Sequence, residues 1–329
     1  MKFLIVGAGA VGAYIGALMS RAGLDVTLLA RGAHLRAMQK HGVRVKSSTG
    51  DFEVQPKIAA SLEEVGPVDV VFLAVKAHSL PPLAPQLKPV LGPETTVVSM
   101  QNGIPWWYFQ GFGGVWEGLR LERIDPGGTI SGAIEARRVL GSIVYFSAEI
   151  PEPGVVQHIQ GGRISLGEPD GSRSERCRQI AEALIASGLR CPITTHIREE
   201  IWVKLLGNAS FNPVSALTRA TVAQMIRDPG VSSLVRNMMQ EVEAVAQKLG
   251  MDLPVSIDQR MAGAEKVGEH KTSMLQDLEA GRPMELEALV GAVVELGERV
   301  GLRMPHTQTV YSCVKLLEKS HGQGGKTEK

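Results

Sequence analysis

The pattern of apolar and polar positions divides the chain into a mixed first part and a helical second part. Up to about residue 195, short apolar runs rich in β-branched residues alternate with helical patterns, as in an α/β domain. From residue 196 on, apolar positions recur at helical spacing, and no further strands are indicated. We therefore predict two domains, residues 1–195 and 196–319, followed by a flexible polar tail at 320–329.

The N-terminal segment carries the clearest pattern. An apolar strand at Lys2–Val6 ends in Gly7, a helical pattern follows, and a second strand is predicted at Asp25–Leu29. This strand, turn, helix and strand form the βαβ unit of a Rossmann-type dinucleotide-binding domain. In the motif G-A-G-A-V-G, we expect Gly7 to make the tight turn, Gly9 to admit a pyrophosphate, and Gly12 to let the helix pack on the strand.

The whole glycine-rich turn is a candidate cofactor site, because a pyrophosphate can sit on the free N–H groups and the positive dipole end of the helix. The alternative is a secretory signal peptide, since Lys2 precedes an apolar run that reaches Met19. That run is glycine-rich, another strand follows it, and it lacks a clear small-residue cleavage site. We therefore predict cofactor contacts from Gly7, Ala8, Gly9, Ala10, Val11 and Gly12.

The end of the second strand bears on which dinucleotide is bound. An NAD site usually places Asp or Glu there to hold the ribose 2′-hydroxyl, whereas this strand ends Leu29-Ala30-Arg31. A guanidinium forms charge-assisted hydrogen bonds with a phosphate, so Arg31 predicts a preference for NADPH/NADP. A solvated loop arginine is the alternative interpretation.

Two further strands end in polar residues that suit a ligand site. The near-continuous apolar run Val68–Val75, typical of a strand buried on both faces, is followed by Lys76. The strand predicted at Thr95–Met100 is followed by Gln101 and Asn102. Because open α/β sheets bind ligands at the carboxyl ends of their strands, we expect Lys76 and Asn102 near the nucleotide. Taken singly, Lys76 could be a strand-end lysine and Asn102 part of a turn.

The remaining elements of the first domain follow from the same patterns. Their alternation indicates a doubly wound sheet. We predict strands at Val43–Lys46, Phe52–Val54, Ile143–Ala148, Val155–Ile159, Arg163–Leu166 and Leu189–Ile193, a helix opening at Arg31–Leu35, and another at Ser174–Ser187.

An aromatic-rich segment interrupts the sheet pattern between Ile104 and Arg138. Aromatic residues make up only 5% of the chain, yet this segment holds three of its four tryptophans. Such a cluster can be a small core of its own, an oligomer contact or a substrate lid. We favour a lid, because the segment directly follows Asn102. The aromatic residues are Trp106, Trp107, Tyr108, Phe109, Phe112 and Trp116.

The helix predicted at Arg198–Leu217 carries a polar row. Lys204, Asn208 and Asn212 recur every four residues and so project from one face of a largely apolar helix. Burying a lysine and two asparagines is costly without partners, which makes the row a candidate site. Pro213 disfavours α geometry at Asn212, so either the helix kinks there or Asn212 caps a new helix.

Two shorter patterns complete the helical half. A helix begins at Thr272-Ser273 and stops at Gly281, and a long helix is predicted at Met284–Val300. Glu285 falls in the first turn of that long helix, where the dipole stabilises a carboxylate and keeps it ionised. Acidic residues are also common at that position for stability alone.

Composition excludes several other classes of protein. A hydrophobic fraction of 44% and a charged fraction of 21% are those of an ordinary soluble globular protein. The net charge of +1 gives no electrostatic case for nucleic-acid or membrane binding. Cys177, Cys191 and Cys313 are scattered without disulfide or metal spacing, which fits a reducing cytoplasm. We predict a cytoplasmic protein without a metal.

These motifs together resemble the ketopantoate reductases (2-dehydropantoate 2-reductases), NADPH-dependent enzymes of pantothenate synthesis. The resemblance implies a Rossmann domain followed by an all-helical domain like that of 6-phosphogluconate dehydrogenase, with the active site in the cleft between them. The matching segments are G-A-G-A-V-G at Gly7–Gly12, Arg31 with His34-Leu35, A-V-K-A at Ala74–Ala77, Q-N-G at Gln101–Gly103, W-V-K-L-L-G-N-A-S-F-N-P at Trp202–Pro213, S-M-L-Q-D at Ser273–Asp277, and Glu285.

The resemblance also implies residue roles. Lys204 matches the general acid, Asn102 the asparagine between nicotinamide and substrate, and Glu285 the acid beside the lysine and the cofactor. An asparagine that some members use, about ten residues beyond Asn212, has no counterpart in Ala220-Thr221-Val222. The aromatic segment looks like an insertion. The implied substrate-binding residues are Asn102, Lys204, Asn208, Asn212 and Ser273.

The resulting functional hypothesis is reduction of 2-dehydropantoate to pantoate with NADPH. A lysine ammonium such as that of Lys204 can stabilise the oxyanion formed by hydride transfer and then donate the proton. One alternative is an NAD(P)-dependent dehydrogenase of another 2-oxo or 2-hydroxy acid. Another is an NADPH-sensing protein without activity, against which the polar row argues. A homodimer is left open.

Overall fold

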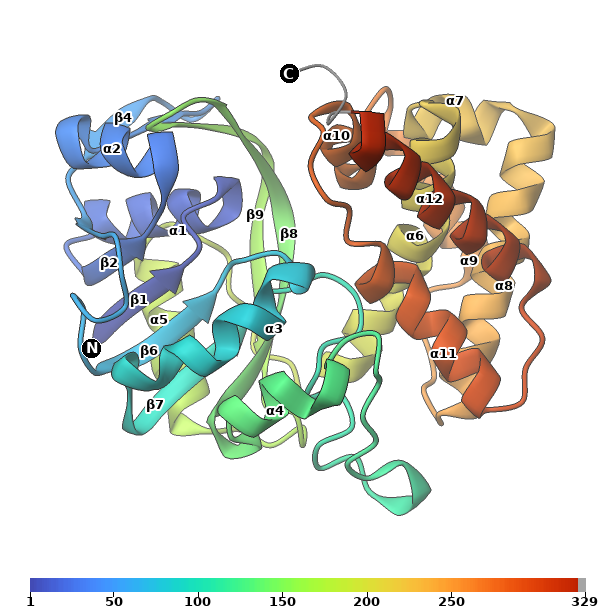
Figure 1. Ribbon diagram of the computed structural model, residues 1–329, viewed down its shortest axis with the longest axis horizontal. Helices are drawn as coiled ribbons and strands as arrows, with labels where there is room; N and C mark the ends of the chain where they lie inside the picture. The colour runs from blue at the N-terminus through green and yellow to red at the C-terminus, as the bar shows by residue number, and fades with distance from the viewer. Residues whose placement is uncertain (325–329) are drawn as a thin grey trace. The chain divides into compact units, whose positions relative to one another are not determined.

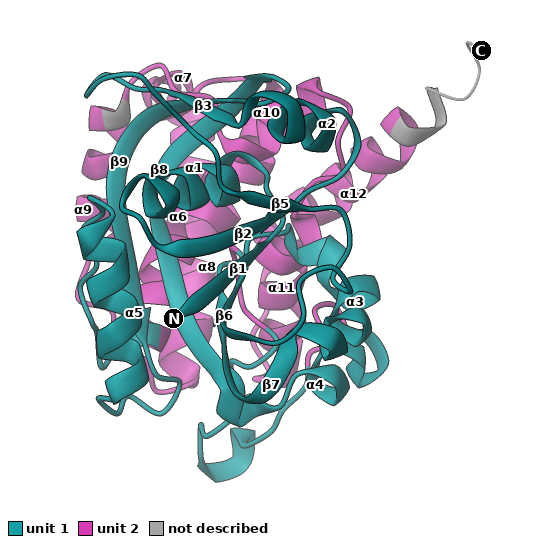
Figure 2. Cartoon of the chain, turned by 90° about the vertical axis from the view of Figure 1, so that its left-hand side faces the viewer, with its two compact units in different colours: residues 1–101, 106–120, 125–197 teal, residues 102–105, 121–124, 198–329 magenta. Residues whose placement is uncertain are grey.

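The computed structural model describes residues 1–324, and the chain in it forms two compact units (Figure 1). Unit 1 comprises Met1–Gln101, Trp106–Arg120 and Asp125–Ile197, and unit 2 comprises Asn102–Pro105, Leu121–Ile124 and the chain from Arg198 on (Figure 2). Two short segments of the first half therefore belong to the helical unit, which the sequence pattern did not predict.

Unit 1 is built on one sheet whose strand order is β4-β3-β9-β8-β7-β6-β1-β2-β5. Its apolar, β-branched runs form the buried strands, as predicted. The strands are β1 Lys2–Val6, β2 Asp25–Leu29, β3 Val43–Lys46, β4 Phe52–Val54, β5 Lys57–Ala59, β6 Val68–Leu73, β7 Leu91–Ser99, β8 Val139–Glu152 and β9 Val155–Gly167. The α-helices are α1 Ala10–Arg21, α2 Gly32–His41, α3 Leu80–Leu83, α4 Thr129–Ala133 and α5 Glu175–Ala186, and the 3₁₀ turns are η1 Ala77–Ser79, η2 Ala84–Val90, η3 Gly114–Trp116, η4 Pro126–Gly128 and η5 Ala136–Arg138.

Strand β1 marks the point where the winding of the sheet reverses. It pairs in parallel with β2 on one side and with β6 on the other, and Val6 is in register with both Leu29 and Leu73. The carboxyl ends of the three strands therefore meet at one edge. In an open α/β sheet this edge, at such a switch point, is where ligands bind.

Helix α1 packs against several strands of the sheet. Every residue from Gly12 to Met19 is buried, and the helix contacts β2 as well as β8 and β9. Tyr14 of α1 stacks on His158 of β9, with ring centroids 4.7 Å apart and planes inclined by 7°. A helix that is apolar all round can be stable only when it is covered on all sides. The curled sheet supplies that cover.

The strands after residue 139 differ from the prediction. The expected short strands at 143–148, 155–159 and 163–166 are parts of one long antiparallel hairpin, β8–β9 (Figure 1). The strand expected at Leu189–Ile193 is wrong, because only isolated bridges form there, Arg163 to Arg190 and Leu166 to Ile193. Pro192 has no N–H to donate, so a continuous ladder cannot form through it.

The aromatic segment forms a small core within unit 1. Trp107 and Tyr108 are 1% and 0% exposed, and Tyr108 meets Phe109 edge to face at 4.8 Å. The Trp107 ring lies so close to Gly141 of β8 that a Cβ there would come within 2.8 Å of it. This burial favours a packing role over the lid that we favoured from the sequence.

Helices are the only regular elements among the described residues of unit 2. None of the described helices is both long and apolar enough to cross a membrane. The helices are α6 Ile197–Thr218, α7 Val222–Arg227, α8 Pro229–Lys248, α9 Ile257–Val267, α10 Ser273–Glu279, the π-helical turn η6 Glu287–Gly291, α11 Ala292–Arg299 and α12 Pro305–Gly324.

Two predictions about unit 2 need correction. The helix expected at Met284–Val300 begins only at Leu286, and it opens with the π-helical turn η6. The tail expected from Ser320 is wrong as far as Gly324, because α12 continues to that residue. Once a helix is nucleated by packed turns, each added residue gains one hydrogen bond, so a polar segment can extend it. The rest of the predicted tail, residues 325–329, lies outside the described residues.

Candidate functional site

The glycine turn between β1 and α1 has the geometry that a pyrophosphate loop requires. Gly7 has φ +101°, and a Cβ there would come within 2.7 Å of Val75 Cγ1. A Cβ on Gly12 would lie 2.2 Å from the carbonyl oxygen of Gly7, so only glycine permits this close packing. A Cβ on Gly9 would meet nothing within 4 Å, which leaves open space for a ligand at that backbone.

The first turn of α1 suits an anion. Gly9 is its N-cap residue and supplies no side-chain cap, and the first turn holds no acidic residue. Ala10 and Val11 follow as the first helical residues. The backbone N–H groups and the dipole of such a helix start attract a phosphate. These residues therefore fit a dinucleotide.

Arg31 and Lys76 lie at the same edge of the sheet as this turn. Arg31 follows β2 and is the exposed N-cap residue of α2, and Lys76 follows β6 and is half-buried. Gln101, to which the sequence assigned no role, ties the end of β7 to this edge. Its Nε2 donates to the carbonyl oxygens of Leu73 at 2.8 Å and Val75 at 3.1 Å.

Three of the predicted residues form a hydrogen-bonded chain within unit 2. Lys204 Nζ donates to Asn102 Oδ1 at 2.7 Å, and Asn102 Nδ2 donates to Glu285 Oε2 at 3.4 Å. The amide of Asn102 thus presents its oxygen to the ammonium and its nitrogen to the carboxylate. Burial lowers the pKa of Lys204 to about 8, the charge of Glu285 opposes this shift, and that of Arg260 adds to it.

The backbone around these residues explains their positions. Helix α6 passes through Pro213 without ending, so Asn212 is a buried residue inside the helix and not the cap of a new one. Glu285 precedes the first helical turn, where its carbonyl oxygen accepts the N–H of Leu289 at 3.1 Å. The predicted helix start was therefore two residues too early, and Glu285 lies just before the first turn, where it keeps the favourable dipole position.

The other predicted residues are less closely connected. Asn208 is half-buried and Asn212 is buried, and both lie on the α6 face that carries Lys204. Ser273 is the exposed first residue of α10, next to its N-cap Thr272. Contact of Ser273 with a substrate stays a prediction.

Arg260 is a residue of this region that sequence reasoning missed. It lies on α9, and its guanidinium rests on Gly207 of α6, where a Cβ would come within 2.4 Å of Nη2. Gly207 follows Lys204 by three residues and so lies on the neighbouring part of the same surface. The signal available in the sequence was the glycine inside a strong helical pattern, which often marks a close approach.

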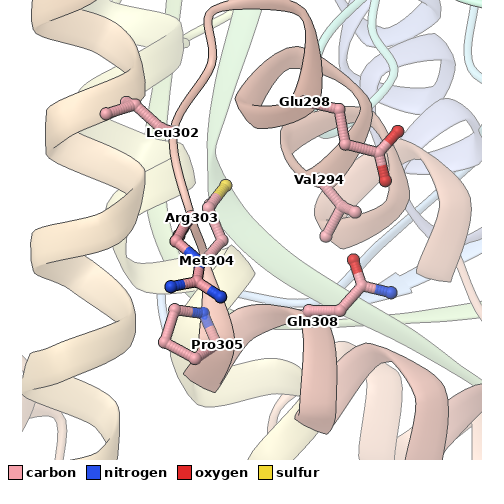
Figure 3. Close-up of a pocket in the computed structure, with 7 residues that line it drawn as sticks. All are labelled: Val294, Glu298, Leu302, Arg303, Met304, Pro305 and Gln308. Atoms are coloured by element: carbon pink, nitrogen blue, oxygen red, sulfur yellow. The ribbon is translucent and has the colours of Figure 1, made fainter.

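Unit 2 also contains a separate hollow of about 530 Å³ (Figure 3). The polar ends of Glu298, Arg303 and Gln308 surround it, and it contains none of the predicted site residues. This hollow is therefore distinct from the Lys204 region. The hollow is lined by Val294, Glu298, Leu302, Arg303, Met304, Pro305 and Gln308.

Known proteins share both the fold and the motifs. Residues 3–106 match the family model "Ketopantoate reductase PanE/ApbA", and residues 196–318 match "Ketopantoate reductase PanE/ApbA C terminal". Over 323 residues the chain is 50% identical to a 2-dehydropantoate 2-reductase of Mesorhizobium japonicum, covering 98% of this chain and 99% of that one. The crystal structure of a candidate ketopantoate reductase from Ralstonia solanacearum matches with a TM-score of 0.92 at 39% identity, over 98% of both chains.

Together with the fold and the site, these matches define a nicotinamide-dependent oxidoreductase that acts on a CH–OH group. More particularly, the chain belongs to the ketopantoate reductase family, as the resemblance predicted. The same fold also occurs in a protein solved with NADH. A D-mandelate dehydrogenase solved with NADH and anilino(oxo)acetate has it too, with a TM-score of 0.84 at 22% identity over 98% of this chain and 99% of its own. The preference for NADPH therefore stays a prediction.

Proposed function

We propose that this protein reduces 2-dehydropantoate to pantoate with NADPH, in the synthesis of pantothenate and coenzyme A. The observation that carries the proposal is the hydrogen-bonded chain Lys204–Asn102–Glu285. These three residues belong to a protein that is 50% identical over its length to a 2-dehydropantoate 2-reductase. A 2-oxo acid needs a hydride at C2 and a proton on the oxygen, and the chain offers a group for the proton.

The cofactor would be held by backbone and by two cationic side chains. The glycine turn Gly7–Gly12 receives the pyrophosphate at the start of α1. Arg31 binds the 2′-phosphate, since no acidic residue at the end of β2 repels it, and Lys76 contributes a second positive charge at the same edge. When bound, the nicotinamide supplies the hydride.

Lys204 is the general acid of the proposal. Its ammonium stabilises the negative charge that develops on the substrate oxygen and then donates the proton from Nζ. Asn102 holds Nζ in place, and Glu285 keeps the lysine charged against the effect of burial. A pKa near 8 suits this task, because an acid works best when its pKa is close to the working pH.

Substrate placement falls to the polar groups around Lys204. Asn208 and Asn212 project from the same face of α6, and an amide can both donate and accept hydrogen bonds. Ser273 is assigned a hydroxyl contact by family resemblance. We further propose a cytoplasmic location, because Cys177, Cys191 and Cys313 are all free thiols. A homodimer stays a prediction.

The proposal is tested by incubating the purified protein with NADPH or NADH and a panel of 2-oxo acids, and following oxidation of the cofactor. We expect the highest kcat/KM with 2-dehydropantoate and NADPH. In Arg31→Ala the preference for NADPH should collapse through the KM for NADPH, since this variant lacks the guanidinium that binds the 2′-phosphate. Faster turnover of an aryl or branched 2-oxo acid would establish the alternative dehydrogenase, and NADPH binding without turnover of any acid would establish the sensor.

A further inference from the structure

A guanidinium lies beside the proposed general acid on the surface of α6. A Cβ on Gly207 would lie 2.4 Å from Nη2 and 2.9 Å from Nε of Arg260, so the guanidinium rests on the helix backbone itself. Gly207 is buried, and Arg260 is half-buried on α9. The absence of a side chain at position 207 is what makes room for the guanidinium.

The spacing of Lys204 and Gly207 suits a small bifunctional anion. Residues three apart on a helix are neighbours, with Cβ positions roughly 5–6 Å apart. The ammonium at position 204 and the guanidinium over position 207 therefore approach the same small region from adjacent points. In a 2-oxo acid the carboxylate is bonded directly to the carbonyl carbon, so the groups that bind its two ends must also be adjacent.

We infer that Arg260 binds the carboxylate of the substrate and so selects 2-oxo acids over neutral carbonyl compounds. The inference rests on the proposed function, since it assigns Lys204 to the carbonyl oxygen of the same molecule. A guanidinium is planar, always charged, and matches a carboxylate with two parallel hydrogen bonds. Lys204 must donate its proton during each turnover, which makes it a poor permanent counter-ion. The chemistry of the two side chains therefore suits Arg260 to the carboxylate and Lys204 to the carbonyl oxygen.

The electrostatics of the region support this arrangement. Arg260 lowers the pKa of Lys204, whereas Glu285 raises it, and Glu200 lies one turn before Lys204 on α6. A carboxylate bound to Arg260 neutralises its charge, so Arg260 then lowers the pKa of Lys204 less. The acid therefore holds its proton most firmly when the substrate is present.

The test compares Arg260→Gln and Arg260→Lys with wild type, with Arg227→Gln as the matched control. Arg227 is an exposed arginine of the same unit that pairs with Glu269. The readouts are the KM for 2-dehydropantoate, the inhibition constants of pantoate and of its neutral carboxamide, and the Kd for NADPH. We expect Arg260→Gln to raise the KM for 2-dehydropantoate and the inhibition constant of pantoate by about 10²-fold, as for loss of one partner of a desolvated charge pair. Binding of the carboxamide and of NADPH should not change, and Arg260→Lys should recover part of the affinity.

Gly207→Ala is a second variant that keeps the charge and moves it. The new methyl group must displace the guanidinium, while alanine favours the helix over glycine. The KM for 2-dehydropantoate should rise without a lower Tm. If Arg260→Gln does not fold, this variant and its pantoate inhibition constant decide the question.

The pH profile gives a second readout, which checks that the charge of Arg260 acts on Lys204, while the comparison of pantoate with its carboxamide decides whether Arg260 binds the carboxylate. Loss of the Arg260 charge should shift the alkaline limb of kcat/KM to higher pH, because Arg260 lowers the pKa of Lys204. The inference would be overturned if Arg260→Gln raised the inhibition constants of pantoate and of its carboxamide equally. It would also be overturned if the inhibition constant of pantoate did not change. Either result leaves the proposed function standing if wild type reduces 2-dehydropantoate. If wild type reduces a different 2-oxo acid, the same comparison is made with that acid and its amide. If wild type neither reduces nor binds any 2-oxo acid, both proposals fall.

Discussion

Lys204 keeps a charge in a half-buried position because burial and a neighbouring carboxylate act on it in opposite directions. Burial disfavours the ammonium, and Glu285 on the far side of Asn102 favours it. The outcome is a lysine whose pKa lies near 8, well below its ordinary value of 10.5. A lysine on the surface would be a weaker acid, and one without Glu285 would lose its proton at a lower pH.

This balance predicts the pH dependence of the reaction. The proton donor is the charged form, so kcat/KM should be constant below pH 8 and fall tenfold per pH unit above about pH 8. Glu285→Gln should move that limb to lower pH, because the carboxylate raises the pKa of Lys204. Lys204→Ala should abolish the limb and lower kcat by at least ~10²-fold. Near-normal turnover in Lys204→Ala would remove this lysine from the mechanism.

The same shift has a consequence for stability. The folded-state pKa is below the unfolded value, so the unfolded chain binds more protons between about pH 8 and 10.5, and the free energy of unfolding rises with pH across that window. Below pH 8 the folded protein carries the cost of a buried charge. Lys204→Met should therefore flatten this rise in urea titrations.

At the scale of elements, the sequence predicted the row of polar residues on α6, but not the residues that contact this row. The spacing of Lys204, Asn208 and Asn212 gave the shared face, because helical periodicity is local. The hydrogen bond to Asn102 joins residues 102 positions apart, and no local pattern encodes it. Arg260 was missed for the same reason, since its position depends on how α9 packs on α6.

The π-helical turn η6 is the element that fixes Asn102. Its widened winding is seen where Ala292 N–H donates to the carbonyl oxygen of Glu287, five residues back. The carbonyl oxygen of Ala288 accepts the N–H of Ile104 at 3.2 Å, which ties the segment 102–105 to the turn. Gly103 has φ +87°, and a Cβ there would lie 2.1 Å from that carbonyl oxygen. Single π turns recur at functional sites in other proteins.

Gly103→Ala should therefore uncouple Asn102 from Lys204. The methyl group must push the segment off η6, and a displacement of about 1 Å at a catalytic group can cost ~10²-fold in rate. We expect a lower kcat in stopped-flow or steady-state assays. The matched control is Gly301→Ala, which has a similar φ of +70° but open space around its Cβ. Equal reductions of kcat in the two variants would show that backbone strain alone is responsible.

At the scale of the whole molecule, the sequence predicted the two-part organisation but not the long-range strand pairing of the sheet. Alternating strands and helices indicated a Rossmann-type unit, and helical spacing indicated the second unit. The pairing of β3 with β9 joins Arg44 to Val155, and nothing in either strand specifies it locally. The assignment of 102–105 and 121–124 to the helical unit was equally hidden. It rests on contacts such as the N–H groups of Glu122 and Arg123 donating to Glu295 at 3.1 and 3.2 Å.

The aromatic segment shows how burial decides between two interpretations of one sequence. A lid must move with substrate, whereas a core residue must not. Trp107 is 1% exposed and lies against Gly141, and Tyr108 and Phe109 pack on one another. Exposing such rings during each turnover would cost roughly 1.5–3 kcal/mol per side chain. The segment is therefore expected to act on the stability of unit 1, and not on catalysis.

Trp107→Ala tests this expectation. Removing a fully buried tryptophan should lower the free energy of unfolding by about 3–5 kcal/mol, because both its transfer energy and its packing are removed. The KM for substrate and the Kd for NADPH of the folded fraction should not change. Trp116→Ala, a tryptophan that is only half-buried near the exposed tip of the segment, is the matched control and should have a smaller effect in the same urea titration. If Trp107→Ala instead keeps its stability and shifts the preference among 2-oxo acids, the segment contacts substrate, and the lid interpretation returns.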